Sequence, residues 1–293
     1  QELDAAQEVA SAAREAVHWL SDVVAPDVIL VSTPHGMEVS RDFAFYLGST
    51  ASGHADIGQD APHNKNNSHS YRVKLDSIPL APELTQDLLD FLPTNLFHVT
   101  GLLNFADSED MTLRWGEVIP LSLLTNETEA SSSNLRKKRK DTNRRYMILS
   151  HPLRRYKEAP NMVGGLLQLG EAIRRWADRR PERIALLVSS DLSHTHRADG
   201  PYGYSNTSTP FDMAVGRWAT DFRANEEDLL GTAKDLQLQA EACGFTGMVL
   251  LHGAVSCEKQ ASESNTQGSF VSKLWADRNV TYYGMMVATF FKQ

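Results

Sequence analysis

Two short apolar runs, each followed by a polar loop that contains histidine, constrain the fold of this chain more than any other feature. One run is residues 28–31 (VILV), and the other is residues 183–188 (RIALLV). Continuous apolar runs of this length are typical of strands buried on both faces of a parallel sheet. Because segments with helical periodicity lie around these runs, we expect an α/β fold with a central, mostly buried sheet flanked by helices on both faces.

The helical segments are recognised by apolar residues that recur at every third or fourth position. One of them begins at Pro82, since proline favours the first turn of a helix. The expected helices are residues 3–21, 82–91, 163–175, 211–223, 229–242 and 246–254, and residues 280–291 (VTYYGMMVATFF) are expected to form a terminal strand.

The length suits one domain over residues 1–293 with a substantial hydrophobic core. No apolar stretch approaches the roughly 20 residues of a membrane helix, so we expect a cytoplasmic protein without a membrane partner. The two cysteines, Cys243 and Cys257, exclude a disulfide framework and a CxxC zinc site. Ten histidines remain as candidates for a metal or acid–base site.

Residues 126–145 (NETEASSSNLRKKRKDTNRR) differ from the rest of the chain. They are rich in serine and then carry seven lysines and arginines between Arg136 and Arg145, with no apolar period. We expect a basic surface insertion; the alternative is a nuclear-import signal or an anionic-surface contact at residues 136–145, which would make the chain an interaction protein. The whole chain has 29 basic and 37 acidic residues, which argues against a nucleic-acid partner.

Two histidine-bearing loops follow the two apolar runs. His35 comes just after the first run, and Asp191 and His194 come just after the second. Loops at the carboxyl ends of parallel strands form the usual binding crevice of an α/β sheet. Since imidazole is both a metal ligand and an acid–base group near neutral pH, these residues are the first candidates for a site.

Three motifs together resemble a known family. They are VILVSTPHG at residues 28–36, SSDLSHTHRADGPYGY at residues 189–204 followed by Phe211-Asp212, and ACGFTGMVLLHGAV at residues 242–255. Their order and spacing are similar to the class III extradiol dioxygenase superfamily, which includes protocatechuate 4,5-dioxygenase β subunits and Memo proteins. The resemblance covers nearly the whole chain from Asp27 onward.

The resemblance implies a single α/β domain that holds non-haem Fe(II), with Zn or Cu as alternatives, and cleaves a catechol-type ring with O2. A site of two histidines and one carboxylate leaves positions open for an aromatic diol and O2. By the resemblance, His35 is a metal ligand, His194 is the acid–base group, and Asp191 orients the loop of His194. The partners expected are the small aromatic diol and O2, and a homodimer is left open.

The chain departs from the family pattern at two places. The family's first histidine ligand lies on a strand before the first helix, whereas this chain starts at Gln1 within that helix. We therefore expect that strand and ligand to precede Gln1. Trp115 stands where many ring-cleaving members have a histidine, and tryptophan does not transfer protons.

The third metal ligand has two candidates, Glu241 and Cys243. Glu241 would complete the site with a carboxylate, whereas Cys243 matches the cysteine of Memo-like relatives. A thiolate before a helix N-terminus is expected to be stabilised by the helix dipole and to favour a softer metal such as copper. The alternative function is therefore a Memo-like metal- or peptide-binding protein without ring-cleavage activity.

Overall fold

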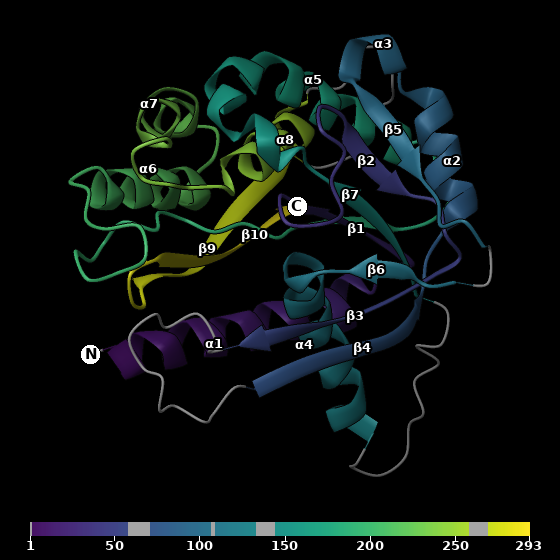
Figure 1. Cartoon of the computed structure of the whole chain (residues 1–293), viewed down its shortest axis with the longest axis horizontal. Coiled ribbons are helices and arrows are strands. Elements are labelled where there is room, and N and C mark those ends of the chain that lie inside the picture. Colours follow the sequence, from purple (N-terminus) through teal and green to yellow (C-terminus); the bar gives the residue numbers. More distant parts are fainter. Residues whose placement is uncertain (1, 58–70, 107–108, 133–143, 258–268) are drawn as a thin grey trace. The chain divides into compact units, whose positions relative to one another are not determined.

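The computed structural model describes residues 2–57, 71–106, 109–132, 144–257 and 269–293 (Figure 1). The contacts divide the chain into two compact units. Unit 1 comprises Gln1–Ala16, Tyr156–Arg179 and Ser190–Gln293, and unit 2 comprises Val17–Arg155 and Arg180–Ser189. Helices and mixed parallel and antiparallel strands make up the described chain, which confirms the α/β class. That the chain forms a single domain stays a prediction.

Unit 2 contains a five-stranded sheet. Its strands are β1 (Val28–Thr33), β2 (Phe43–Tyr46), β5 (Val99–Leu102), β7 (Arg145–Ser150) and β8 (Ile184–Val188), in the order β5-β2-β7-β1-β8. Strand β1 is parallel to both β7 and β8, β2 is parallel to β5, and β2 is antiparallel to β7. All six residues of β1 are buried, as its apolar run predicts.

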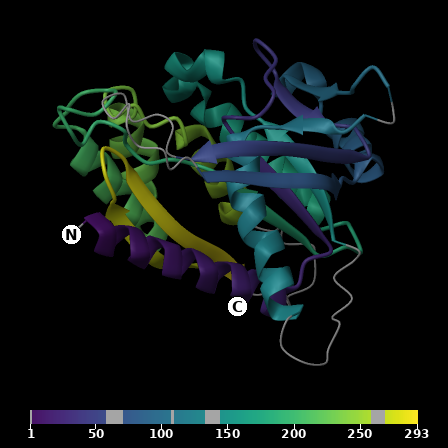
Figure 2. The same ribbon diagram turned by 60° about the horizontal axis from the view of Figure 1, so that its bottom comes forward.

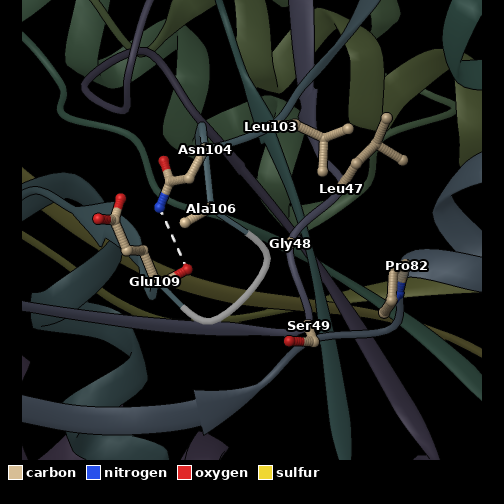
Figure 3. A pocket seen from close by; sticks show the side chains of 8 residues that line it. All are labelled: Leu47, Gly48, Ser49, Pro82, Leu103, Asn104, Ala106 and Glu109. Atoms are coloured by element: carbon tan, nitrogen blue, oxygen red, sulfur yellow. Dashed lines mark hydrogen bonds between the residues drawn. The ribbon is translucent and has the colours of Figure 1, made fainter.

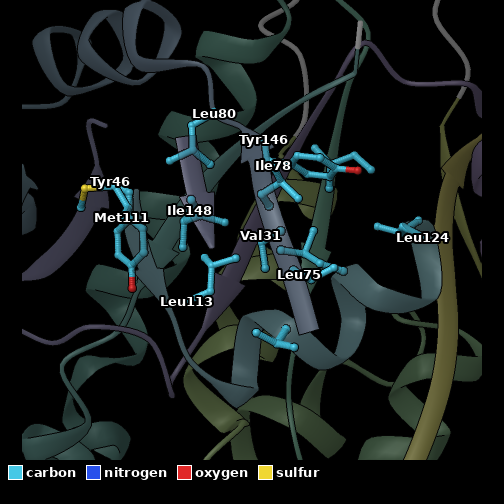
Figure 4. Close-up of a cluster of buried hydrophobic side chains, with 14 of the residues drawn as sticks. Val31, Tyr46, Leu75, Ile78, Leu80, Met111, Leu113, Leu124, Tyr146 and Ile148 are labelled. Atoms are coloured by element: carbon cyan, nitrogen blue, oxygen red, sulfur yellow. The ribbon is translucent and has the colours of Figure 1, made fainter. Parts of the chain in front are cut away.

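Unit 2 also contains a second sheet and three α-helices. The strands are β3 (Thr50–Ile57), β4 (Tyr71–Pro79) and β6 (Met111–Leu113), in the order β4-β3-β6, and the helices are α2 (Pro82–Phe91), α3 (Thr94–Phe97) and α4 (Trp115–Ser132). Side chains of both sheets and of α4 form one hydrophobic core, in which Val31, Ile148 and Leu113 lie (Figure 4). Packing of this apolar surface is what holds the two sheets together.

The carboxyl ends of β1 and β8 lie next to each other. Ser32 pairs with Val188, and the Ser189 N–H donates to the Ser32 carbonyl at 2.9 Å. The turn that carries His35 and the loop that begins at Ser189 therefore leave the same edge of the sheet, which is the arrangement expected from the two apolar runs.

Unit 1 is built from helices around a two-stranded hairpin. The helices are α1 (Glu2–His18, to Ala16 in this unit), α5 (Ala159–Ala177), α6 (Ser208–Thr220), α7 (Lys234–Leu236) and α8 (Phe245–Ser256), and the hairpin is β9 (Phe270–Asn279) with β10 (Gly284–Lys292). Figure 2 shows the purple α1 along the yellow hairpin. Val9 and Ala12 pack there against Ala276 and Val280.

Most of the expected helices are present. Residues 3–21, 82–91, 163–175, 211–223 and 246–254 correspond to α1, α2, α5, α6 and α8, within a few residues at the ends. The prediction for residues 229–242 is wrong in its second half. The first half is helical, as a π-helical segment (Asp228–Ala233) and the short α7 (Lys234–Leu236). Turns follow as far as Glu241, whose φ is +52°.

Two strand predictions need correction. Residues 183–188 form a strand, but β8 is the last strand of its sheet and its side chains are half-buried rather than buried on both faces. Residues 280–291 are not one strand, because the chain turns between Asn279 and Gly284 and only β10 follows. The preceding strand β9 was not predicted.

The expected basic insertion at residues 126–145 is shorter than the sequence suggests. Helix α4 continues to Ser132, and Arg145 already starts β7. Arg144 is buried rather than solvated, and its Nε donates to the Pro26 carbonyl at 3.4 Å. Residues 133–143, with five of the seven bases, lie outside the described residues.

No helix among the described residues combines the length and the apolar character that crossing a membrane requires. This agrees with the absence of a long apolar stretch in the sequence.

Candidate functional site

The loop after β8 holds His194 of unit 1 in a defined orientation. Its backbone N–H donates to the Ala240 carbonyl at 2.8 Å, and its ring Nδ1 lies 2.6 Å from the Glu241 carbonyl oxygen. A carbonyl has no proton, so Nδ1 must donate this hydrogen bond. In the neutral ring, Nε2 therefore carries the lone pair that accepts a proton. This is the arrangement that an acid–base histidine needs.

Glu241 takes part in this arrangement through its backbone. Its φ of +52° lies in the left-handed region that residues with a Cβ rarely adopt, and its carboxylate is exposed. The carbonyl oxygen of this left-handed residue is the atom that accepts the hydrogen bond from the His194 ring. That the Glu241 carboxylate is a metal ligand stays a prediction.

Asp191 and Cys243 lie together beside His194. Cys243 Sγ donates to Asp191 Oδ2 at 3.6 Å, and the same carboxylate oxygen lies 3.8 Å from His194 Nε2. The side chains of all three residues are half-buried. Of the predicted site residues, unit 1 thus brings together Asp191, His194 and Cys243, and it adds the carbonyl of Glu241.

The thiol of Cys243 is not stabilised as a thiolate, contrary to the expectation from its place before a helix. The residue does precede α8, which begins at Phe245. Burial and then the Asp191 carboxylate nevertheless raise the pKa of Cys243 well above its ordinary value. A backbone hydrogen bond lowers the pKa by less than these two influences raise it, so the group is a protonated thiol unless a cation lies beside it.

A buried carboxylate, Asp212 of α6, fixes the back of the same loop. Its Oδ1 accepts the Ser193 N–H at 2.9 Å, and its Oδ2 lies 2.6 Å from His196 Nε2. The Gly284 N–H donates to the Ser193 carbonyl at 2.9 Å, and a Cβ at Gly284 would overlap with the Asp212 carboxylate. Burial, and then the charge of Asp212, raise the pKa of the neighbouring Asp277 to about 6.

In unit 2, His35 lies in the turn after β1. Its backbone N–H donates to Thr33 Oγ1 at 3.1 Å, and its ring stacks on Trp115, with ring centroids 4.3 Å apart. The neighbouring Gly36 is buried, and a Cβ there would lie 2.5 Å from Glu117 Oε1 and 2.7 Å from Ser150 Oγ. Only glycine fits this close approach, which explains why glycine follows His35.

Glu117 of α4 is a fully buried carboxyl group under the His35 turn. It accepts hydrogen bonds from the Tyr46 hydroxyl at 2.8 Å and from the Arg114 N–H at 2.8 Å, and Tyr46 Oη in turn accepts the Met37 N–H at 2.5 Å. Burial raises the pKa of Glu117 to about 7 despite these bonds. Burial and the Glu117 charge likewise raise the pKa of Tyr46. Sequence reasoning did not identify this pair.

Two further histidines are buried within their units. His151 Nε2 lies 2.7 Å from Ser32 Oγ in unit 2, and burial lowers the pKa of His151 to about 3. His252 Nδ1 accepts the Trp218 indole N–H at 3.0 Å in unit 1. Both rings have hydrogen-bond partners in the core, so their role is structural.

Three tyrosines near His194 were not predicted as one group. Tyr202 comes from the GPYGY turn, whereas Tyr282 and Tyr283 lie in the turn between β9 and β10. Their ring centroids lie 5.4 to 6.3 Å from the His194 ring. Asn279 and Gly284, which lie on either side of Tyr282 and Tyr283, were the available signal for a turn. This segment lay inside residues 280–291, which the sequence pattern predicted as a strand.

Unit 2 also contains a small hollow of about 150 Å³ between the ends of β2 and β5 (Figure 3). Leu47, Leu103 and Glu109 are among the residues that line it, and the Asn104 side-chain amide donates to the Glu109 carbonyl at 3.2 Å. None of the predicted site residues lines this hollow.

Comparison with known families finds no family model that matches the chain. The chain is similar to protein CA_C1420 of Clostridium acetobutylicum, a name that states no activity, with 30% identity over 122 residues. The matched stretch is 40% of this chain, and the chain spans only 26% of the length of that relative. The similarity therefore adds no function to what the geometry supports.

Proposed function

We propose that this chain is a metal-dependent, extradiol-type dioxygenase that opens a catechol-type ring with O2. The observation that carries the proposal is the His194 site of unit 1, in which the Nδ1 proton is held by a backbone carbonyl and Nε2 faces Asp191. His194 belongs to the DLSH loop that carries the resemblance to extradiol dioxygenases.

The side chains of this site fit a divalent transition metal better than Mg²⁺ or Ca²⁺. Cys243 offers a sulfur atom 3.6 Å from the Asp191 carboxylate, and a thiolate ligand favours iron, zinc or copper. A cation would offset the two influences, burial and the Asp191 charge, that keep the thiol protonated. When bound, the ion would bring the diol and O2 together and let electron density pass between them.

Within unit 1, Cys243 or Glu241 is the proposed metal ligand. That His35 of unit 2 is a metal ligand rests on the resemblance alone and stays a prediction. The stacked ring of Trp115 restricts the orientation of the His35 imidazole.

The protein's own residues move the proton. His194 accepts the proton of a substrate hydroxyl at Nε2, since Nδ1 is already committed to the Glu241 carbonyl. The Asp191 carboxylate, 3.8 Å from Nε2, stabilises the imidazolium that forms. The same proton returns to the opened product, so the histidine ends in its starting state.

Anaerobic reconstitution with Fe(II), followed by a panel of catechols and O2, tests the proposal. Metal content is measured first, so that protein without metal is not mistaken for protein that cannot cleave the ring. We expect a yellow ring-opened product from the loaded protein, a loss of about 10²- to 10⁴-fold in His194→Gln, and no change in the exposed control His54→Gln. No turnover by loaded protein on any catechol would refute the proposal.

A second candidate is a Memo-like metal-binding protein without ring cleavage. The contact of Cys243, rather than of the Glu241 side chain, with Asp191 favours it, as does Trp115 in place of the family histidine. Competition between iron and copper separates the two. Copper retained by the wild type, lost on Cys243→Ala and accompanied by no ring cleavage would favour this candidate.

A further inference from the structure

Three aromatic side chains next to His194 have no part in the proposed proton transfer. The His194 ring centroid lies 5.4 Å from that of Tyr202 and 6.3 Å from those of Tyr282 and Tyr283. We call these three residues the tyrosine cluster. It places three aromatic rings close to the proposed acid–base group, all within unit 1.

The tyrosine cluster is fixed to the loop of His194 by backbone hydrogen bonds. The His196 N–H donates to the Tyr282 carbonyl at 3.1 Å, and the Gly284 N–H donates to the Ser193 carbonyl at 2.9 Å. Within the cluster, the Tyr282 ring lies 5.0 Å from the Tyr283 ring and 6.3 Å from the Tyr202 ring. A ring that binds to the cluster is therefore held at a constant distance from His194.

The Tyr202 side chain is accessible to a ligand, since it is 57% exposed although it packs near the rings of His194 and Tyr282. Tyr282 and Tyr283 are half-buried. Exposed tyrosine faces beside a polar group are favourable contacts for a planar ring, because offset stacking contributes about 0.5–1.5 kcal/mol beyond the buried area. The same faces attract cations through the ring quadrupole.

The charges around the tyrosine cluster are negative. Asp191 is close enough to raise the pKa of Tyr283, together with burial, which is the larger cause. Glu241, whose backbone carbonyl contacts the His194 ring, is an exposed acidic residue. Arg197, the cation of the same loop, is held by Asp199 at 2.8 Å and by Glu2 at 2.6 Å. An acidic ligand would meet carboxylates here, whereas an ammonium group would meet carboxylates and ring faces.

We infer that the tyrosine cluster is a subsite for an aromatic ring that bears a protonated amine, so that the substrates are catechols with an ammonium side chain rather than a carboxylate. The inference rests on the proposed function for the diol. Recognition of the ring and of the ammonium group depends on the cluster and on the neighbouring Asp191, so it is tested without turnover.

Three phenols of similar size but different charge test the inference on the metal-free full chain. They are tyramine, 4-ethylphenol and 4-hydroxyphenylacetate, and calorimetry measures their affinities at neutral pH. We expect tyramine to bind about tenfold more tightly than 4-hydroxyphenylacetate, with 4-ethylphenol between them. Butylamine, an amine without a ring, should bind more weakly than tyramine, which separates the subsite from general attraction to an acidic chain.

Variants then locate the binding. Tyr202→Ala should weaken tyramine binding at least about threefold, and Tyr202→Phe should restore it, because the ring rather than the hydroxyl makes the contact. Tyr204→Ala is the matched control, since Tyr204 is equally exposed two residues further along. Equal affinities for the three phenols, equal binding of butylamine, or unchanged tyramine binding in a folded Tyr202→Ala would each overturn the inference.

A ranking of catechol substrates by kcat/KM separates this inference from the proposed function. With Fe(II)-loaded protein, kcat/KM should be highest for 4-(2-aminoethyl)catechol and lowest for 3,4-dihydroxyphenylacetate. Ring cleavage with the opposite ranking leaves the function standing and refutes the subsite. Absence of ring cleavage with the expected phenol ranking refutes the function and supports the subsite.

Discussion

The loop of His194 in unit 1 and the turn of His35 in unit 2 follow neighbouring strands, and each is fixed by one buried carboxyl group. Asp212 fixes the first through the Ser193 N–H and the His196 ring. Glu117 fixes the second through the Tyr46 hydroxyl and the Arg114 N–H. The two carboxyl groups differ in the hydrogen-bond partners that surround them.

The hydrogen-bond partners of the two carboxyl groups differ in kind. Asp212 has the His196 imidazole at 2.6 Å. Glu117 has neutral donors at hydrogen-bond distance, so burial dominates and raises its pKa to about 7. The His35 turn is therefore held by a carboxyl group that keeps its proton below neutral pH.

The largest effect on stability is expected for Asp212→Ala. It leaves the Ser193 N–H and the His196 ring without their carboxylate in a buried place, so the free energy of unfolding should fall by about 3 kcal/mol. Urea unfolding measures the loss, and Asp235→Ala, an exposed aspartate, is the control. A loss below about 1 kcal/mol would mean that Asp212 does not hold the loop.

Glu117→Gln should change how stability depends on pH. The folded-state pKa of about 7 lies above the ordinary value of 4.5, so the stabilising contribution of the carboxyl is complete below about pH 4.5 and is lost as the pH rises through 7. Glutamine does not ionise, so the variant should gain up to about 3 kcal/mol relative to the wild type between pH 4.5 and 8.

Unfolding curves at several pH values measure this difference, with the exposed Glu15→Gln as the control. Parallel pH profiles for Glu117→Gln and the wild type would show that folding does not shift the pKa of Glu117. The contrast with Asp212 would then disappear.

Gly36→Ala should destabilise unit 2 by about 1–3 kcal/mol, because its methyl group would press on Glu117 Oε1 and Ser150 Oγ. Gly164→Ala in α5 is a control for which we expect stability to change in the opposite direction. No atom lies within 4 Å of the added Cβ at Gly164, so alanine should stabilise the helix by about 0.5–1 kcal/mol. Thermal unfolding of the two variants should therefore shift in opposite directions, and equal shifts would contradict the packing under His35.

The smallest effect is expected for Glu241→Gly. Glycine adopts the φ of +52° without strain, so stability should rise by about 0.5 kcal/mol while the carbonyl still orients His194. Glu241→Val should have the opposite sign. Retained metal in Glu241→Gly, measured by elemental analysis, would favour Cys243 as the ligand, and lost metal would favour the Glu241 carboxylate.

The parts of the fold that sequence predicted are those set by local pattern. The VILV run gives the fully buried β1, and Pro82 marks the start of α2. The turn at Tyr282 was missed because two aromatic residues in an apolar stretch favour a strand, and the turn depends on a contact with His196 that is remote in sequence.

The same limit applies to the candidate site. His194 and Cys243 were identified from motifs, and the structure brings both to Asp191. Glu117 was missed because its burial depends on the packing of α4 against the His35 turn, which no local pattern reveals. The role of the Glu241 backbone was likewise invisible, because a residue type does not disclose a left-handed φ.

The most direct test of the central claim, ring cleavage by a metal-loaded site with His194 as the acid–base group, is a reaction under ¹⁸O₂. Mass spectrometry of the product from Fe(II)-loaded wild type should show ring opening, with ¹⁸O in the newly formed carboxylate and far less product from His194→Gln. An intact, oxidised ring or a product that takes its oxygen from water would contradict the account.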